Sequence, residues 1–340
     1  MPIGAPPASI TLGAPAAPAA LLAMLEGGGQ VSGRELAERL GVTRAAVWKQ
    51  IERLRELGLE VGAKAGEGYR LQASVDLLDA RRINAGLSPA VRRALDDLAV
   101  HWQLDSTNSE LCRLIDTAPR HRLVCLAEIQ THGRGRRGRA WRMPLTGGIA
   151  LSLLQRFDGA IASLAGLSLV AGITTIDALE DCGIRGAGLK WPNDLVIGGR
   201  KLGGILVELR GDAMGPCHAV IGIGINYRIG VRSGIAIERP WIDLTELAGG
   251  MLPSRNRVAA RLIERLSASM DRFADVGFAG FADAYARHDV LRDRAIRVLA
   301  GDETRDGVAR GVDARGALRV AFAEGERVVD AAEVSIRVDA

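Results

Sequence analysis

The most distinctive stretch of the chain is Gln130-Thr131-His132-Gly133-Arg134-Gly135-Arg136-Arg137-Gly138-Arg139-Ala140-Trp141. It follows the apolar run 123–129, which predicts a buried strand. Its glycines let the backbone approach a ligand closely, and its four arginines offer planar forks for phosphate or carboxylate oxygens. It lacks the GK[ST] of a Walker A loop, and although Gly133, Gly135 and Gly138 have the spacing GxGxxG, we do not interpret it as a dinucleotide-binding turn. A solvated or RNA-contacting loop is the alternative, and the closing Trp141, which can stack on a base, weakens it.

A second motif, Leu189-Lys190-Trp191-Pro192-Asn193-Asp194, is followed by a Gly198-Gly199 turn and the segment 200–208. It holds Lys190 and Lys201, two of only four lysines among 44 basic residues. A lysine ammonium can reach a single oxygen where a guanidinium group does not fit. Lys201 therefore suggests a site at this position that requires an ammonium group. Chance placement of four lysines remains the alternative.

Two weaker signals flank these motifs. The run 220–226 predicts a buried strand whose glycines leave room for a ligand, although glycine in a strand more often marks a bulge. Asn226 at its end can both donate and accept hydrogen bonds. Asp105-Ser106-Thr107-Asn108 predicts a turn in which Ser106 or Thr107 caps the following helix.

The N-terminal part predicts short helices over 19–26 and 32–40, then a third helix that Thr43 caps and that carries Val47, Ile51 and Leu54 at helical spacing. A β-hairpin over 59–71 follows. Two helices joined by a short turn with a glycine, followed by a hairpin, are typical of a winged helix-turn-helix. Its second helix would enter the major groove, which makes Arg44, Trp48 and Lys49 the candidate DNA contacts. A protein-interaction module with a solvated basic face is the alternative. Residues 26–70 hold eight basic and seven acidic side chains, so useful DNA affinity would need a dimer.

Composition narrows the class of protein. The 340 residues are 48% hydrophobic and 25% charged, as in globular proteins of two or three domains. The four cysteines are irregularly spaced, which favours neither zinc nor a disulfide framework and suggests a reducing cytoplasm. No uninterrupted apolar run reaches the roughly 20 residues of a membrane helix. The Ala/Pro-rich start lacks the features of a signal peptide and predicts a disordered extension.

These patterns predict an α+β chain of several parts. We expect a disordered extension over 1–17, a winged helix-turn-helix over 18–75, a linker over 76–100 and a mixed α/β catalytic domain over 101–290. Short β-branched runs after residue 291 predict a small β-barrel or sandwich over 291–340.

In this order, behind a winged helix, the motifs resemble those of the bifunctional biotin–protein ligases that also act as the biotin operon repressor. The resemblance covers nearly the whole chain from about Leu21 onward, and it implies the biotin/lipoyl-ligase fold with an SH3-like C-terminal domain. The implied reaction has two steps. Biotin and ATP form biotinyl-5′-AMP, and a lysine of the biotin carboxyl carrier protein of acetyl-CoA carboxylase then takes the biotin.

The resemblance also implies roles for individual residues. Arg136 and Lys201 would act on the carboxylate and the α-phosphate. The chemistry of its carboxylate, and not the resemblance, makes Asp194 a candidate to help hold Mg²⁺. The biotin-binding residues would be Ser106, Thr107, Gln130, Gly133, Arg134, Arg136, Lys201, Gly204 and Gly222. The ATP- or adenylate-binding residues would be Arg139, Trp141 (on adenine), Lys190, Asn193 and Asn226.

Further implied properties are biotin as corepressor, operator DNA as partner, a ligand-promoted homodimer, and a cytoplasmic protein without membrane contact. Two alternatives stay open from the sequence. One is a lipoyl–protein ligase, and the other is a transcription factor that senses a ligand without ligase activity.

Overall fold

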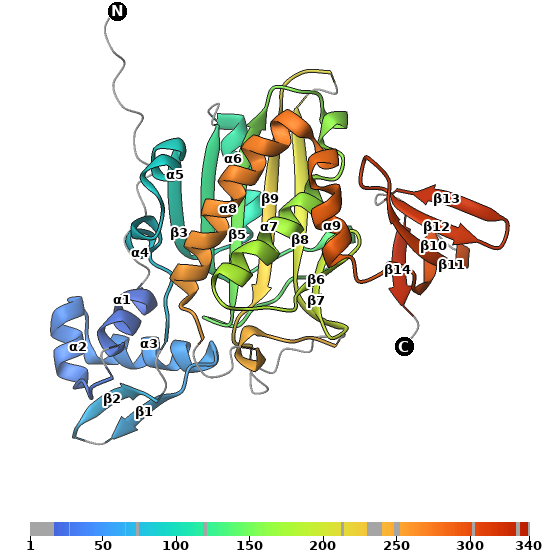
Figure 1. Cartoon of the computed structure of the whole chain (residues 1–340). Coiled ribbons are helices and arrows are strands. Elements are labelled where there is room, and N and C mark those ends of the chain that lie inside the picture. The colour runs from blue at the N-terminus through green and yellow to red at the C-terminus, as the bar shows by residue number, and fades with distance from the viewer. Residues whose placement is uncertain are drawn as a thin grey trace, which may run out of the picture.

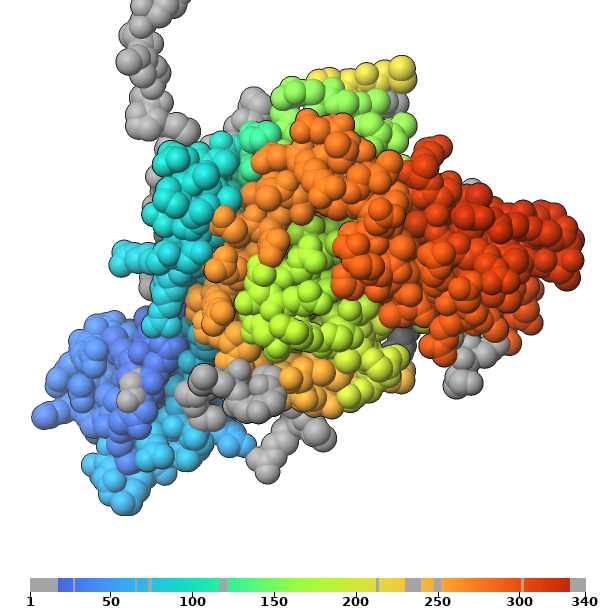
Figure 2. All heavy atoms as spheres, viewed as in Figure 1, coloured from blue at the N-terminus to red at the C-terminus, as the bar shows by residue number. Residues whose placement is uncertain are grey.

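The computed structural model describes residues 17–26, 28–64, 66–72, 75–117, 121–211, 214–229, 240–247, 252–300, 303–330 and 334–338. Three parts follow one another along the molecule, with the N-terminal helices and the C-terminal sheet on opposite sides of a larger central part (Figures 1 and 2). The predicted extension over residues 1–17 lies outside the described residues except for Ala17, where the first helix begins.

The N-terminal part has the predicted winged helix-turn-helix order. Its elements are α1 (Ala17–Leu25), α2 (Gly33–Leu40), α3 (Arg44–Glu56), β1 (Val61–Lys64) and β2 (Gly68–Leu71). Ser32 and Thr43 cap α2 and α3. The side-chain oxygen of each accepts a hydrogen bond from the backbone N–H three residues later, at 3.1 and 3.2 Å. The buried stripe of α3 is Val47, Ile51 and Leu54, as its spacing predicts.

The core of this part continues into the central part. Leu145 is buried in the same apolar cluster as Leu36 and Ile51, and Trp102 and Ile129 pack against it. The winged helix is therefore docked on the central part through apolar side chains and is not a free module on a tether.

The central part is built on one seven-stranded sheet of order β3-β4-β5-β9-β8-β7-β6. Only the β3–β4 pair is parallel among these neighbours. The strands are β3 (Asp97–Leu104), β4 (Arg122–Gln130), β5 (Gly148–Phe157), β6 (Gly188–Lys190), β7 (Asp194–Ile197), β8 (Arg200–Gly211) and β9 (Cys217–Asn226). The helices are α4 (Ala80–Ala85), α5 (Pro89–Ala94), α6 (Thr107–Thr117), α7 (Leu167–Asp181), α8 (Arg255–Val276) and α9 (Ala282–His288). The 3₁₀ turns are η1 (Arg136–Gly138), η2 (Ile161–Leu164), η4 (Leu244–Glu246) and η5 (Phe278–Phe281).

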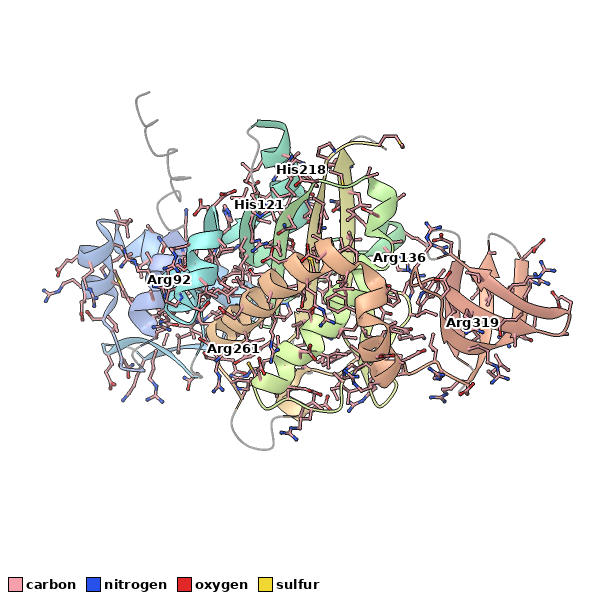
Figure 3. The ribbon with its side chains drawn as sticks, turned by 45° about the horizontal axis from the view of Figure 1, so that its top comes forward. Arg92, His121, Arg136, His218, Arg261 and Arg319 are labelled. Atoms are coloured by element: carbon pink, nitrogen blue, oxygen red, sulfur yellow. The ribbon has the colours of Figure 1, made fainter. Side chains whose placement is uncertain are left out.

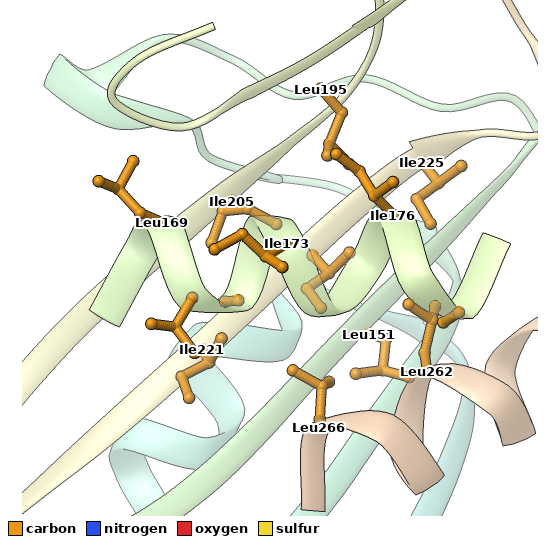
Figure 4. Close-up of a cluster of buried hydrophobic side chains, with 14 of the residues drawn as sticks. Leu151, Leu169, Ile173, Ile176, Leu195, Ile205, Ile221, Ile225, Leu262 and Leu266 are labelled. Atoms are coloured by element: carbon orange, nitrogen blue, oxygen red, sulfur yellow. The ribbon is translucent and has the colours of Figure 1, made fainter. Parts of the chain in front are cut away.

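Alternation along the strands gives the sheet two different faces. Ile221, Ile223 and Ile225 of β9 belong to the main core, where α7 and α8 pack (Figure 4). The side chains between them lie on the other face, where Val220 meets α6 in a smaller apolar cluster and Gly222 and Gly224 leave the sheet bare. The second face therefore has room for side chains from other segments and for a ligand between them.

Helix α7 lies in a long apolar segment of the chain. The span Ile161–Asp181 is long and apolar enough for a membrane helix by length and composition. It is mostly buried inside the protein, where α7 packs on the sheet beside α8, so its composition reflects a core position (Figure 4).

The stretch expected as a linker, 76–100, holds α4, α5 and the start of β3, and its first residues are fixed to the central part. Leu78 N–H donates to Glu128 Oε1 at 2.6 Å, and Arg255 Nη1 donates to the carbonyl of Asp76 at 2.9 Å. Arg255 and Glu128 themselves form a fully buried ion pair at 2.8 Å. These bonds satisfy a pair of charges that could not otherwise be buried.

The C-terminal part is a five-stranded antiparallel sheet of order β13-β12-β11-β10-β14. Its strands are β10 (Ala295–Ala300), β11 (Glu303–Val312), β12 (Leu318–Phe322), β13 (Gly325–Val329) and β14 (Val334–Val338). Trp191 Nε1 donates to the carbonyl of Gly316 at 3.0 Å, and this bond joins the C-terminal sheet to the turn between β6 and β7.

Candidate active site

A cavity of about 640 Å³ lies on the bare face of the central sheet. The arginine-rich loop after β4, the turn between β6 and β7, and the start of α6 surround it, and β5, β8 and β9 form its floor. Its size suits a small-molecule ligand.

Two glycines of β9 make room for side chains that shape this floor. A Cβ atom on Gly222 would lie 2.2 Å from Oδ1 of Asn108, and one on Gly224 would lie 2.5 Å from the indole of Trp141. Both distances are far below van der Waals contact, so any larger residue would displace Asn108 or Trp141. The glycines predicted from sequence as pocket-lining are thus required by their neighbours.

A chain of polar side chains runs under the cavity. Gln130 Oε1 accepts from the N–H of Thr107 at 2.8 Å, and Ser152 Oγ lies 2.7 Å from Thr107 Oγ1 and 2.6 Å from Asn108 Oδ1. Asn108 Nδ2 donates to Glu208 Oε2 at 2.8 Å. This arrangement differs from the expectation that Ser106 or Thr107 caps α6, because Gln130 of β4 satisfies the first helical N–H instead.

Lys201 lies at the centre of the charged part of the cavity. Its Nζ donates to Asp194 Oδ1 at 2.5 Å and lies 5.7 Å from the centroid of the Trp141 ring. Lys201 and Asp194 come from the adjacent strands β8 and β7, so the sheet register brings them together. The geometry places a cation, a carboxylate and an aromatic face within reach of one ligand.

Arg136 also lines the cavity, and Figure 3 labels it on the side of the central part nearer the C-terminal sheet. Its Nη1 lies 3.4 Å from Asn193 Oδ1, while Asn193 Nδ2 donates to the carbonyl of Ile205 at 2.8 Å. Burial, followed by the nearby guanidinium groups of Arg137 and Arg139, lowers the pKa of Arg136. A cation that its surroundings disfavour gains more from an incoming anion, which suits phosphate or carboxylate binding.

The arginine-rich loop is folded back on itself. Gly135 N–H donates to the carbonyl of Arg139 at 2.7 Å, and Trp141 N–H donates to the carbonyl of Gly133 at 2.8 Å. Arg137 has a φ of 58°, in the left-handed region that non-glycine residues seldom adopt. Because the loop folds back on itself, its four arginines all line the cavity although they come from one short segment.

The cavity brings together nearly every residue predicted from the motifs. Its lining includes Ser106, Thr107, Gln130, Arg134, Arg136, Arg139, Trp141, Lys190, Asn193, Asp194, Lys201, Gly204, Gly222 and Asn226. Gly133 is not among the lining residues. A Cβ there would lie 2.4 Å from the carbonyl oxygen of Trp141, so the absence of a side chain at Gly133 allows the two ends of the loop to approach each other. Asn226 Nδ2 donates to the carbonyls of Lys201 and Ile242, which fixes the segment beside Lys201.

Sequence reasoning missed four lining or supporting residues. Asn108 stands in the quoted turn without an assigned role, and Ser152 and Glu208 gave only the weak signal of single polar residues in apolar strands. Trp241 also lines the cavity, because its segment pairs with Lys201. A strand pattern cannot show which residues of other strands lie beside it.

The candidate DNA contacts lie elsewhere, on α3. Arg44, Trp48 and Lys49 are all exposed, and Trp48 is 54% exposed despite its size. An exposed large aromatic between two basic side chains on the second helix of the pair is consistent with a nucleic-acid surface.

Comparison with known proteins agrees with all three parts. Residues 19–70 match a helix-turn-helix domain, residues 102–226 the biotin/lipoate A/B protein ligase family, and residues 293–337 the biotin protein ligase C-terminal domain. The bifunctional ligase/repressor BirA of Salmonella typhimurium is 38% identical over 301 residues, which cover 88% of this chain and 91% of the relative. The chain belongs to the family of bifunctional biotin–protein ligase/repressors.

Two further members of the wider family agree. The bifunctional ligase/repressor BirA of Bacillus subtilis is 31% identical over 320 residues, covering 90% of this chain and 94% of the relative. The biotin protein ligase of Aquifex aeolicus, solved in complex with biotin and ATP, superposes with a TM-score of 0.61 at 27% identity over 72% of this chain and 99% of that one. The family assignment from the motifs is confirmed, as is the α+β fold of a helix-turn-helix, a biotin-ligase part and a small C-terminal sheet.

Proposed function

We propose that this chain is a biotin–protein ligase that joins biotin to ATP as biotinyl-5′-AMP and transfers biotin to a lysine of the carrier protein of acetyl-CoA carboxylase. The observation that carries this proposal is the placement of Lys201 beside Asp194 and Trp141 in a cavity walled by Arg136. It also acts as a repressor that binds operator DNA through α3.

In the first step, a carboxylate oxygen of biotin attacks the α-phosphorus of ATP and pyrophosphate leaves. Negative charge gathers on the α-phosphate, so Lys201 and Arg136 stabilise the transition state electrostatically. Arg139 contacts the phosphates, and Trp141 stacks on adenine, while Lys190, Asn193 and Asn226 hold the nucleotide. No side chain acts as nucleophile in this step, because the attacking oxygen belongs to biotin.

In the second step, the ε-amine of the carrier lysine attacks the carbonyl carbon of the mixed anhydride and AMP leaves. The biotin rings lie over Ser106, Thr107, Gln130, Gly204 and Gly222, beside the loop of Gly133 and Arg134. A closed loop keeps the anhydride away from water until the carrier arrives.

The residues present fit a Mg²⁺ ion only in part. The described residues hold no group of three or more His, Cys, Asp or Glu side chains that could bind a metal. Asp194 is the carboxylate that could supply one oxygen, and Mg²⁺ in nucleotide sites commonly takes one or two carboxylates plus substrate phosphates. When bound, the ion would neutralise charge on the phosphates.

The remaining parts of the proposal concern location and assembly. The protein works in the cytoplasm, without a membrane, as a homodimer that biotinyl-5′-AMP promotes, with biotin as corepressor. A dimer supplies two recognition helices, which the nearly balanced charge of residues 26–70 requires for useful DNA affinity.

A direct test of the ligase is incubation with biotin, ATP·Mg²⁺ and a carrier domain, followed by mass measurement of both proteins. We expect the mass of one biotinyl group on the carrier and release of AMP and pyrophosphate. Lipoate in place of biotin should give no product. An unmodified carrier with biotin would refute the ligase and favour a sensor without ligase activity.

A further inference from the structure

Glu208 lies beside the cavity and contacts the arginine-rich loop. Its side chain extends from β8, is 19% exposed, and is not among the residues that line the cavity. Oε2 of Glu208 accepts a hydrogen bond from Nδ2 of Asn108 at 2.8 Å, and both carboxylate oxygens lie 3.1 Å from Nη2 of Arg134. Glu208 therefore acts on a ligand in the cavity through these neighbours.

Arg134 stands at the base of a small hairpin within this loop. Arg134 and Ala140 form an isolated antiparallel bridge, and the N–H of Trp141 donates to the carbonyl of Gly133 at 2.8 Å. The indole of Trp141 in turn fills the space over Gly224 of β9. A bond that holds Arg134 to the sheet therefore also helps to hold the Trp141 ring over the cavity floor.

Other contacts fix the chain before and after the base of this hairpin. The N–H groups of Thr131 and His132 donate to carbonyls at and directly after the end of β3, both at 2.9 Å. At the tip of the hairpin, Arg136 Nη1 lies 3.4 Å from Asn193 Oδ1, which is long for a hydrogen bond. Between these points, the side chain of Arg134 bonds the base of the hairpin to β8 and α6.

The two acceptors of Arg134 differ in strength. Nη2 of Arg134 bonds to the neutral hydroxyl of Ser109 on α6 at 3.1 Å and to the carboxylate of Glu208. An ionised acceptor binds a guanidinium roughly twice as strongly as a neutral one, so Glu208 supplies most of the anchor. The Arg134 side chain is 43% exposed, so water screens the ion pair in part and the effect of its loss should be moderate.

We propose that Glu208 is a positioning residue that anchors the base of the arginine-rich hairpin to β8 through Arg134 and thereby holds the Trp141 ring over the cavity floor. Under the proposed function, on which the ligand part of this inference rests, Trp141 stacks on the adenine of ATP. Loss of the anchor then weakens ATP binding, although no group that touches ATP has been removed.

The first test is the opening of the hairpin without any ligand. Glu208→Met keeps a side chain of similar length and removes both acceptor oxygens. Trypsin needs an open chain, so cleavage after Arg136 or Arg137, followed by mass spectrometry, reports how often the hairpin opens. We expect this cleavage to be about 3- to 10-fold faster than in the wild type, as for the loss of one partly exposed hydrogen-bonded pair. Cleavage after Arg185, which is exposed between α7 and β6, is the internal reference and should not change.

A double-mutant cycle separates the Arg134 route from the Asn108 route. Arg134→Met should speed cleavage at least as much as Glu208→Met, and the double variant should be cleaved no faster than Arg134→Met alone. Additive effects would show that Glu208 acts through Asn108, and they would overturn the inference. Ser109→Ala removes only the neutral acceptor and should speed cleavage less than Glu208→Met.

The second test concerns ATP. We expect Glu208→Met to raise the KM for ATP about 3- to 10-fold with little change in kcat, because the stacking surface is displaced while the cations that act on the α-phosphate remain. A general loss of structure would lower kcat as well. The control is Glu110→Met, which breaks the pair of Glu110 with Arg113 at 2.6 Å on α6 and should leave hairpin cleavage and both kinetic constants as in the wild type.

The outcomes distinguish this inference from the proposed function. A wild type that forms no adenylate from biotin and ATP would overturn the proposed function, and the cleavage experiments would still test the anchor. Hairpin cleavage in Glu208→Met at the wild-type rate would overturn the inference alone. Faster cleavage with an unchanged KM for ATP would also overturn it, because Trp141 would then keep its place without the anchor.

Discussion

Nζ of Lys201 lies 2.5 Å from Oδ1 of Asp194, and the two residues stand on the neighbouring strands β8 and β7. Lys201 is the only lysine of β8, a strand of the cavity floor. Its bond to Asp194 joins this strand to the end of the turn that begins at Lys190. Any ligand phosphate that attracts Lys201 must therefore compete with a carboxylate already in place. This competition makes the role of Lys201 measurable.

Replacement of Lys201 by alanine should slow pyrophosphate release by at least about 100-fold, because the charge that develops on the α-phosphate loses its nearest cation. The measurement is the rate of pyrophosphate formation at saturating biotin and ATP. Arg200→Ala is the matched control, since Arg200 precedes Lys201 but pairs with Glu246 outside the cavity. Wild-type rates in Lys201→Ala would rule out its assigned role.

Replacement of Arg136 by glycine should let biotinyl-5′-AMP escape before transfer. One charge-assisted contact would be lost, which weakens retention about tenfold or more. Bystander proteins mixed with the variant should then acquire biotin on their lysines, as read by streptavidin blotting. Arg185→Gly is the control, because Arg185 is exposed in the loop between α7 and β6 and is not among the residues that line the cavity. Labelling confined to the carrier in both variants would contradict this prediction.

The double variant Arg44→Ala/Lys49→Ala should lose operator binding and keep ligation. Each lost phosphate contact should also reduce the slope of log affinity against log salt by about 1. Gel shifts at several salt concentrations measure both effects. The control is Arg34→Ala/Arg39→Ala on α2, whose arginines pair with Glu38 and Glu35. An undiminished gel shift with the α3 variant would show that DNA binds to another surface of the protein.

Asp105→Asn should lower stability in a pH-dependent way. The hydrogen bond from Arg113 lowers the pKa of Asp105 to about 2, below the value of about 3.9 in an unfolded chain. The stabilisation is therefore complete above about pH 5 and disappears as the pH falls from about 4 to 2. Because the pair is largely exposed, we expect only about 0.5 to 1 kcal/mol at neutral pH.

Urea unfolding of the wild type and Asp105→Asn at steps from pH 7 to pH 3 checks this expectation. The difference in unfolding free energy should shrink toward the acid end. A difference that stays constant over this range would show that the carboxylate charge is not its source.

Glu128→Gln should destabilise the protein by about 3 kcal/mol, because it leaves the buried guanidinium of Arg255 without its counter-charge. Thermal unfolding measures the loss. Glu264→Gln is a suitable control: Glu264 also accepts a backbone N–H, that of Ser88, and among the described residues it forms no ion pair. Equal stability of the two variants would mean that the Arg255–Glu128 pair contributes little.

Much of the fold could be predicted from local patterns. The caps Ser32 and Thr43 and the spacing of Val47, Ile51 and Leu54 mark the winged helix, because helix signals lie within a few residues of one another. The apolar runs 123–129 and 220–226 mark strands of the core for the same reason. The motif residues of the cavity were found because they cluster in a few short segments.

What could not be predicted depends on pairing between distant segments. The fit of Asn108 over Gly222 and its bond to Glu208 arise from the order of strands β5, β9 and β8, which no single strand encodes. The buried Arg255–Glu128 pair joins residues 127 positions apart. In the sequence, these two residues are indistinguishable from the many other charged residues of the chain.

Because Trp191 bonds to Gly316, the turn after β6 contacts both the cavity and the C-terminal part. On one side Asn193 and Asp194 face the cavity, and on the other the Trp191 indole holds the C-terminal sheet. A ligand that immobilises the turn therefore also reduces the freedom of strands that it never touches. Slower amide hydrogen exchange in β12 upon nucleotide binding would show that the cavity and the C-terminal sheet are coupled through this turn.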